Sequence, residues 1–252
     1  MKKTIITLLA LSSISMAAEP ALVWDLDFDS TGVVFTSYAE GVTSNLSSDA
    51  GSGLISDGAI TLNNSAFSFS QTGGNLSYSD EFTLLAKVQM GKAGNNNHPV
   101  IFSLGETTSW NWKPSFYQNN NKFVLDKDGF GDVVNEENKS SGAVGYTIPE
   151  NGYGDVVTLA LQNNGKGTLT LYVDGVQAGY TTITSANEYS SAKLIKEFKF
   201  GGKLAGSNNN ANIILHDAQF VSGLTTQIIP EPTTATLSLL ALAGLAARRR
   251  RK

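Results

Sequence analysis

The chain has 252 residues, of which 41 % are hydrophobic and 16 % are charged, and it contains no cysteine. This composition excludes an intrinsically disordered chain and a scaffold held together by disulfides. Between residues 18 and 229 the chain carries 11 lysines, no arginine and 21 acidic residues, so the net charge of this part is −10. Such an acidic body repels phosphates, which argues against nucleic acid as a partner, and the lack of arginine argues against a site that clamps acidic sugars.

Residues 1–18 have the features of an export signal in the usual order. Lys2 and Lys3 supply a charged start, 4–14 is a short apolar run, and small residues follow. This order predicts a signal peptide that is cleaved after Ala17 or Ala18. The alternative, an N-terminal core helix, does not require the three features to occur in this order.

Residues 19–229 alternate short apolar segments with clusters of Gly, Asn, Asp and Ser, without a long helical period or an internal repeat. At the start, Trp24, Leu26 and Phe28 alternate with aspartates, the pattern of a strand with one buried face. Short strands at this spacing predict one all-β domain, a two-layer antiparallel sandwich. The other segments that we expect to form strands are 67–69, 82–90, 100–104, 122–125, 156–161, 169–173, 198–200 and 213–220.

Several of these segments resemble the laminin-G-like, concanavalin A-like jelly roll of bacterial surface proteins. The clearest is the hairpin 167–176, in which Asp174 and Gly175 would make the tight turn. The resemblance implies a jelly roll of about 200 residues, with one gap, since 45–71 matches no part of the family pattern and its strand order stays open. The other matching segments are 22–29, 81–88, 198–202, 213–220 and 222–225.

The three aspartates of the first strand, Asp25, Asp27 and Asp29, would share one face. They resemble the paired acids of concanavalin A-like glycoside hydrolases. Those enzymes carry Glu-x-Asp-x-x-Glu or a near variant on a central strand, and this sequence has none. We expect the first strand to lie at the sheet edge, where outward charges discourage pairing with other chains. The aspartates are therefore interpreted as solvated edge residues.

Other catalytic groups are scarce. Cysteine is absent, and the two histidines, His98 and His216, are far apart in the sequence. His98 lies in an asparagine-rich loop, and His216 lies among apolar residues of an expected strand, where a hydrogen-bonded structural imidazole is the favoured interpretation. We expect no catalytic zinc site and no enzyme activity.

Residues 126–137 resemble a calcium loop, with acids at its first, third and last positions, Asp126, Asp128 and Glu137. However, Phe130 stands where an EF-hand needs an oxygen ligand, and a strand precedes the loop in place of the entering helix. We interpret the segment as a glycine-assisted surface turn and expect no cofactor. Calcium held by these three acids is the alternative.

Three asparagine runs and one aromatic segment form a candidate recognition surface. Amide side chains suit sugar hydroxyls, and aromatic rings suit the apolar face of a pyranose. The alternative is structural, because asparagine favours turns and the tryptophans would fill a core. The candidate ligand-binding residues are Trp110, Trp112, Tyr117, Asn96, Asn120 and Asn209.

The C-terminal residues 230–252 begin with Pro230, Glu231 and Pro232, continue as an uncharged apolar segment over 233–247, and end in a basic cluster. Fifteen helical residues span about 22 Å, so 233–247 predicts a short transmembrane helix, with the basic cluster on the cytoplasmic side. The basic cluster consists of Arg248, Arg249, Arg250, Arg251 and Lys252.

The Pro-Glu-Pro motif, the apolar segment and the basic cluster together resemble the PEP-CTERM sorting tail of Gram-negative bacteria. The resemblance implies recognition by a membrane exosortase and cleavage near 230–232. It also implies transient anchoring in the inner membrane, followed by delivery to the cell surface or to an exopolysaccharide matrix. An ordinary C-terminal anchor is the alternative.

The sequence thus predicts a noncatalytic exported protein of the cell surface or extracellular matrix. Its expected partners are the export machinery, the exosortase, and a glycan or exopolysaccharide bound by the jelly roll. Two alternatives remain open: a concanavalin A-like glycoside hydrolase or lyase, and a structural surface component without a specific ligand.

Overall fold

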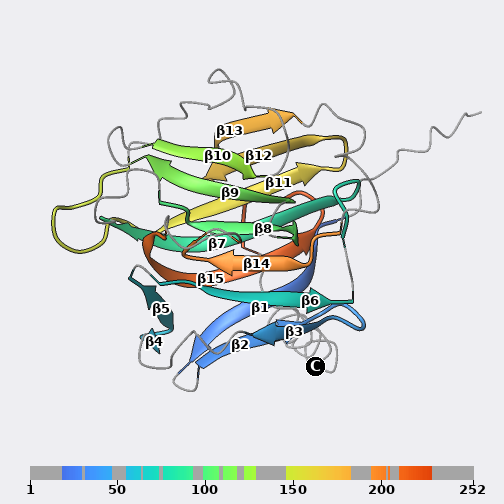
Figure 1. Ribbon diagram of the computed structural model, residues 1–252, viewed down its shortest axis with the longest axis horizontal. Coiled ribbons are helices and arrows are strands. Elements are labelled where there is room, and N and C mark those ends of the chain that lie inside the picture. Colours follow the sequence, from blue (N-terminus) through green and yellow to red (C-terminus); the bar gives the residue numbers. More distant parts are fainter. Residues whose placement is uncertain are drawn as a thin grey trace, which may run out of the picture.

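The computed structural model describes most of the chain between residues 19 and 228 (Figure 1). The predicted signal peptide with Ala17 and Ala18, and the predicted sorting tail with its Pro-Glu-Pro motif, transmembrane segment and arginines, lie outside the described residues. The described ranges are 19–29, 32–46, 55–63, 65–73, 76–92, 99–107, 110–117, 122–128, 146–182, 194–202, 204 and 210–228.

Two antiparallel β-sheets face each other. The larger sheet has nine strands, seven of them in the order β13-β12-β11-β7-β15-β1-β2, and the pair β4-β5 joins it through β15. Its strands are β1 (Ala21–Asp29), β2 (Gly32–Ser37), β4 (Ile55–Ser56), β5 (Ala59–Leu62), β7 (Glu81–Gly91), β11 (Val157–Asn164), β12 (Thr168–Val173), β13 (Val176–Thr182) and β15 (Asn212–Ser222).

The smaller sheet has six strands in the order β10-β9-β8-β14-β6-β3, and Figure 1 shows it in front of the larger one. Every strand ladder is antiparallel, and the described residues contain strands but no helix, so the all-β antiparallel prediction is confirmed. The six strands are β3 (Thr43–Leu46), β6 (Phe67–Thr72), β8 (Phe102–Thr107), β9 (Trp110–Tyr117), β10 (Lys122–Asp128) and β14 (Glu197–Phe200). Within the part of the chain described here, no helix has the length and apolar character needed to cross a bilayer.

An aromatic core fills the space between the sheets. Trp24 of β1 is fully buried, and its ring lies 5.2 Å from Phe69, 5.1 Å from Phe198 and 5.8 Å from Phe220, measured between centroids. The indole Nε1 donates a hydrogen bond of 2.9 Å to Oε1 of Gln71, so the one polar atom of the ring is satisfied. The alternation that predicted one buried face of the first strand is confirmed by these contacts.

Two tight hairpins use the same turn chemistry. Asp174 and Gly175 have φ of 48° and 78° between β12 and β13, which confirms the predicted turn. Asp57 and Gly58 have φ of 52° and 73° between β4 and β5. This second hairpin lies in the stretch whose strand order the sequence left open, and it carries the same Asp-Gly signal.

The prediction that the first strand lies at the sheet edge is wrong. β1 pairs with β2 on one side and with the closing strand β15 on the other. As a result Asp25 is only 3 % exposed, although Asp27 and Asp29 are exposed. The pairing joins the two ends of the domain, which alternation within one strand cannot reveal.

The surface-turn interpretation of 126–137 is also wrong in its first part. β10 continues through Asp128, and its residues Asp126 and Asp128 pair with Lys113 and Asn111 of β9. The remainder of this segment, from Gly129 through Glu137, lies outside the described residues.

Candidate functional site

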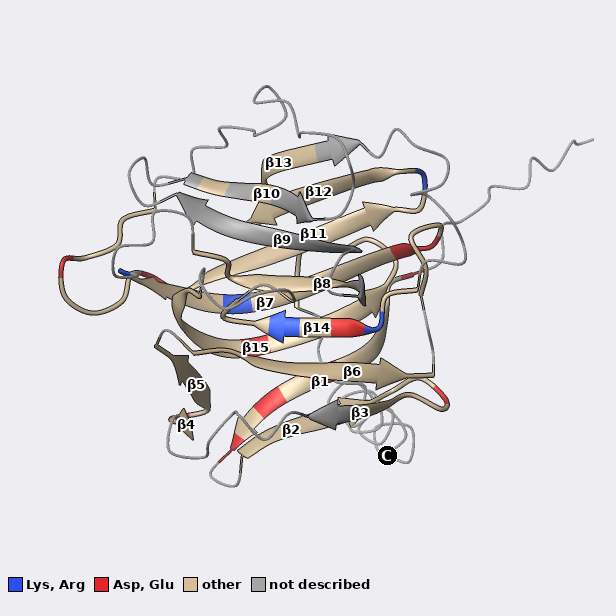
Figure 2. Ribbon diagram, in the orientation of Figure 1, with Lys and Arg blue, Asp and Glu red and all other residues tan. Residues whose placement is uncertain are grey.

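The outer face of the nine-stranded sheet carries the polar groups that form the candidate site. Along β7 the residues Phe82, Leu84, Ala86, Val88 and Met90 belong to the core between the sheets. Because side chains alternate along a strand, Lys87, Gln89 and Gly91 face outward. Figure 2 shows a basic position on β7 and acidic positions on β1 and β15 of the same sheet.

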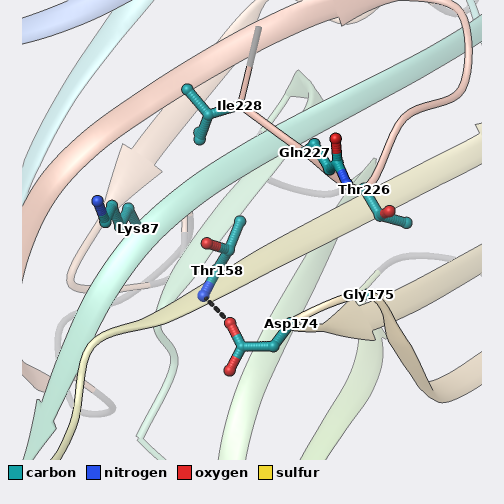
Figure 3. A pocket seen from close by; sticks show the side chains of 7 residues that line it. All are labelled: Lys87, Thr158, Asp174, Gly175, Thr226, Gln227 and Ile228. Carbon is teal, nitrogen blue, oxygen red and sulfur yellow. Dashed lines mark hydrogen bonds between the residues drawn. The ribbon is translucent and has the colours of Figure 1, made fainter.

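One cleft of about 430 Å³ opens beside Lys87, and we call it the Lys87 cleft (Figure 3). β7, β11, the Asp-Gly turn and the last described segment of the chain each contribute to its wall. The lining residues are Lys87, Thr158, Asp174, Gly175, Thr226, Gln227 and Ile228.

Hydrogen bonds hold the walls of the Lys87 cleft in place. The backbone N–H of Thr158 donates to Oδ1 of Asp174 at 2.7 Å, and the N–H of Asp174 donates to the carbonyl oxygen of Thr158 at 2.8 Å. On the other side, Nε2 of Gln162 donates to the carbonyl oxygen of Thr225 at 2.8 Å. The cleft is therefore formed before any ligand arrives.

A second cleft of about 220 Å³ lies at the end of β7, and we call it the Tyr153 cleft. It is lined by an aromatic ring, a carboxylate, an ammonium group and two amides, a set that matches the apolar face and the hydroxyls of a sugar ring. The lining residues are Gly91, Lys92, Glu150, Asn151, Gly152, Tyr153 and Asn212.

The Tyr153 ring occupies space that a side chain at position 91 would fill. A Cβ atom on Gly91 would stand 2.8 Å from Cε1 of Tyr153. The N–H of Met90 donates to the Tyr146 hydroxyl at 2.7 Å, and that hydroxyl donates to the carbonyl oxygen of Asp155 at 2.9 Å. Burial raises the pKa of Tyr146, so its hydroxyl stays protonated and able to donate. These bonds fix the segment that carries Tyr153 to the sheet.

Described residues that flank two of the predicted asparagine runs lie in or near this cleft or bridge to each other. Asn212 pairs with Gly91, and its Nδ2 donates to the carbonyl oxygen of Lys92 at 2.6 Å. Val100 forms an isolated bridge with Asn210. The structure thus joins the bases of the segments that contain Asn96 and Asn209, although these two residues and Asn120 lie outside the described residues.

The predicted aromatic residues lie elsewhere in the fold. Trp110, Trp112 and Tyr117 all belong to β9 of the six-stranded sheet, whereas both clefts are formed by the nine-stranded sheet and adjoining segments. Of the predicted calcium ligands, Asp126 and Asp128 lie in β10. Among the described residues there is no group of three or more His, Asp or Glu side chains arranged to hold a metal ion.

A carboxyl pair lies next to Lys87 on the same face. A side-chain hydrogen bond to Asp25 of β1 contributes to the raised pKa of Asp217 on β15, and because ionised carboxylates only accept, this bond requires one of the two carboxyls to be protonated. Burial, followed by the charges of Asp25 and Asp27, raises the pKa of Asp217 to about 7, and Lys87 opposes this shift. Asp25 is only 3 % exposed, so the pair is closed to a large substrate.

His216 is hydrogen-bonded, as expected from the sequence. Its Nε2 lies 2.8 Å from Oε1 of Gln89. Burial, followed by the charge of Lys87, lowers the pKa of His216, so the imidazole stays neutral over a wider pH range. The predicted structural role of this histidine fits these contacts.

Sequence reasoning missed the residues that line the two clefts. The sequence pattern identifies Asp174 only as a turn residue, and it does not single out Lys87, Tyr153 or Asn212. The sequence offers one signal, the Asn-Gly-Tyr-Gly segment at 151–154, where two glycines flank an aromatic residue. Glycines beside an aromatic residue indicate close backbone approach, but they do not say to what.

No protein-family model matches the chain, and a search of curated proteins found no match. Among solved structures, the binding domain of botulinum neurotoxin serotype G is similar over 82 % of this chain and 49 % of its own, with a TM-score of 0.51 and 18 % identity. The serotype D ligand binding domain in complex with N-acetylneuraminic acid is similar over 81 % of this chain and 48 % of its own, with a TM-score of 0.51 and 15 % identity. The chain spans about half the length of these structures, and at this identity the likeness is one of fold.

Proposed function

We propose that the protein is a noncatalytic exported protein of the cell surface or extracellular matrix that binds a glycan through its β-sandwich, a concanavalin A-like jelly roll. The observation that carries the proposal is the Tyr153 cleft. It combines an aromatic ring with the side chains of Glu150, Asn151 and Asn212 in a space of about 220 Å³. A sugar ring presents hydroxyls at its edge and an apolar face, and this set of groups complements both.

The charge distribution favours a neutral glycan. The serotype D domain was solved with an acidic sugar, but neither cleft of this chain contains an arginine, and the body carries a net charge of −10. A polyanionic glycan would be repelled at long range, whereas a neutral one would not.

The carboxyl geometry supports binding over hydrolysis. Glycoside hydrolases hold two carboxyl groups about 5 to 9.5 Å apart on either side of the scissile bond. Asp25 and Asp217 are in direct hydrogen-bond contact, and Asp25 is only 3 % exposed. No sugar fits between them.

A glycan array with the purified protein, run with calcium and with a chelator, tests the proposal. We expect binding to neutral polysaccharides in both conditions, and loss of binding in Tyr153→Ala. Tyr180→Ala is the matched control, because Tyr180 is 43 % exposed and lies outside both clefts. An array without any hit would favour a structural component without a ligand. Release of reducing sugar from polysaccharides incubated with the protein would favour the hydrolase.

We further propose that the two ends of the chain direct export and sorting. The order of features in residues 1–18 and 230–252 supports a cleaved signal peptide and an exosortase-processed tail that anchors the protein in the inner membrane until cleavage. Replacing Pro230, Glu231 and Pro232 by alanines should leave an uncleaved membrane-bound form in an exosortase-positive host. Fractionation and mass spectrometry measure this, and a native protein that still ends at Lys252 would contradict the proposal.

A further inference from the structure

The two clefts lie at opposite ends of one row of outward-facing residues on β7. Lys87 lines the first cleft and Gly91 lines the second. Gly91 is four residue steps beyond Lys87 along an extended strand, a distance of about 13 Å at roughly 3.3 Å per residue. This separation exceeds the length of a single sugar ring, so one monosaccharide cannot reach both clefts.

Hydrogen bonds fix the side chain that lies between the clefts. Gln89, the outward residue between Lys87 and Gly91, donates from Nε2 to the carbonyl oxygen of Gly154 at 2.9 Å, and its Oε1 lies 2.8 Å from Nε2 of His216. Both ends of the Gln89 amide are therefore engaged, and the side chain lies across the sheet in a fixed position.

An apolar residue adjoins this surface. Val156 directly precedes β11 and is 41 % exposed; β11 pairs with β7 from Val157 opposite Val88, and extending this register by one residue puts Val156 opposite Gln89. An exposed valine beside a flat amide offers a contact for the apolar face of a sugar between the two clefts.

Both clefts have the same balance of charge. The wall of the Lys87 cleft contains one lysine and one aspartate, Lys87 and Asp174, and the wall of the Tyr153 cleft contains Lys92 and Glu150. Each cleft therefore offers donors and acceptors for hydroxyl groups without a net charge of its own. A linear glycan with similar neutral units along its length would meet similar chemistry at both ends.

We infer that the two clefts are subsites of one track along β7 that binds a linear neutral oligosaccharide, with the Tyr153 cleft and the Lys87 cleft holding sugar units at its two ends. This inference rests on the proposed glycan-binding function and adds the length of the ligand. It makes an extended polysaccharide chain, and not a terminal sugar, the preferred partner.

Calorimetry with ligands of increasing length tests the track. The probes are linear oligosaccharides of glucose, mannose, xylose and N-acetylglucosamine, each from the disaccharide to the hexasaccharide. For the sugar that binds, we expect affinity to rise by about tenfold or more, which is about 1.4 kcal/mol, once the chain is long enough to reach the second cleft. Equal affinity for the disaccharide and the hexasaccharide would overturn the track but leave glycan binding intact. Absence of binding by every probe would overturn both.

Two variants separate the subsites. Gly91→Ala brings a methyl group to 2.8 Å from the Tyr153 ring and should displace it, so both short and long ligands should bind at least about tenfold more weakly. Tyr153→Ala should weaken binding of both ligands in the same way, and it replaces the glycine variant if Gly91→Ala perturbs folding. Lys87→Ala should remove only the gain that comes with length.

Lys166→Ala is the charge-matched control for Lys87→Ala, because Lys166 is exposed and lines neither cleft. It should leave the affinity for every ligand unchanged. Two results with Lys87→Ala would overturn the track: an equal loss for short and long ligands, or no loss for either. Melting curves of each variant establish that the fold is intact.

Discussion

The two faces of the nine-stranded sheet are stabilised in different ways. On the inner face, Trp24 and Phe220 pack ring against ring with Phe198 of the facing six-stranded sheet, and the rings of Phe198 and Phe220 are 5.1 Å apart. The outer face carries a small apolar cluster around Leu85 and the hydrogen-bonded pair Asp25–Asp217. Because β1 contributes Trp24 to one face and Asp25 to the other, adjacent residues of one strand depend on different physical forces.

This difference predicts that the stability contributed by the two faces responds differently to pH and to truncation of side chains. Packing of uncharged rings does not depend on proton concentration, whereas a shared proton between two carboxyls does. The inner face should therefore contribute most of the stability, and the outer face should contribute most of its variation with pH. The variants below test each half of this contrast.

The largest effect should come from Trp24→Ala. Removing the ring leaves a cavity beside Phe69 and Phe198, and it leaves Oε1 of Gln71 without its indole donor. We expect a loss of about 3 to 5 kcal/mol in the free energy of unfolding, measured by urea denaturation. The loss should be the same at pH 5 and pH 8.

Two further variants sharpen this result. Trp24→Phe retains an aromatic ring and should lose less than the alanine variant. Tyr180→Ala, at a position that is 43 % exposed, should change stability by no more than about 0.5 kcal/mol. A Trp24→Ala loss that resembles the Tyr180→Ala loss would contradict the packing argument.

The second-largest effect should be the pH dependence of the free energy of unfolding, which comes from the outer face. The pKa of Asp217 is raised to about 7 from its ordinary value of 3.8. A raised folded-state pKa gives stability that is complete below the ordinary value and is lost as the pH rises through about 7. Between pH 5 and pH 8 we expect the free energy of unfolding to fall by up to about 3 kcal/mol.

Asp217→Asn isolates this contribution. The asparagine amide can still donate to Asp25 but does not titrate, so the slope between pH 5 and pH 8 should flatten. The lowered pKa of His216 acts in the opposite direction below its ordinary value of 6.5, so the comparison must be the difference between the two proteins. Urea denaturation at a series of pH values measures it, and equal slopes would show that the pair does not hold the proton.

The fold could be predicted further than the site. Alternation around Trp24 identified the buried face of β1, and the Asp174–Gly175 pair identified a hairpin, because both signals are local. The Asp57–Gly58 hairpin carried the same signal in a stretch without a recognised pattern, and it was missed.

The environment of Asp25 could not be predicted, because it depends on pairing with β15, almost 200 residues further along the chain. The Tyr153 cleft brings together Gly91, Tyr153 and Asn212 from three separate segments in the same way. Local patterns show which face of a strand is apolar. They do not show which strand lies beside it or what covers its polar face.

The smallest effect should come from replacing Lys87. This residue lines the Lys87 cleft and also lies next to the carboxyl pair of the outer face. Lys87 pairs with Asp217 in the register between β7 and β15, and its charge lowers the pKa of both Asp217 and His216. In Lys87→Met the pKa of Asp217 should rise further, so the pH at which stability is lost should move upward. The total stability at pH 5 should change little, since the lysine side chain is exposed.

Carboxyl carbon NMR of Asp217 and imidazole NMR of His216 measure the two shifts directly. Both titrations should move to higher pH in Lys87→Met, because the loss of one positive charge favours the protonated form of each group. Lys166→Met removes an equal charge from the β11–β12 turn and should move neither titration. If the two lysine variants behave alike, the effect would be one of net charge, and the outer face would respond to pH without any contribution from the residue that lines the cleft.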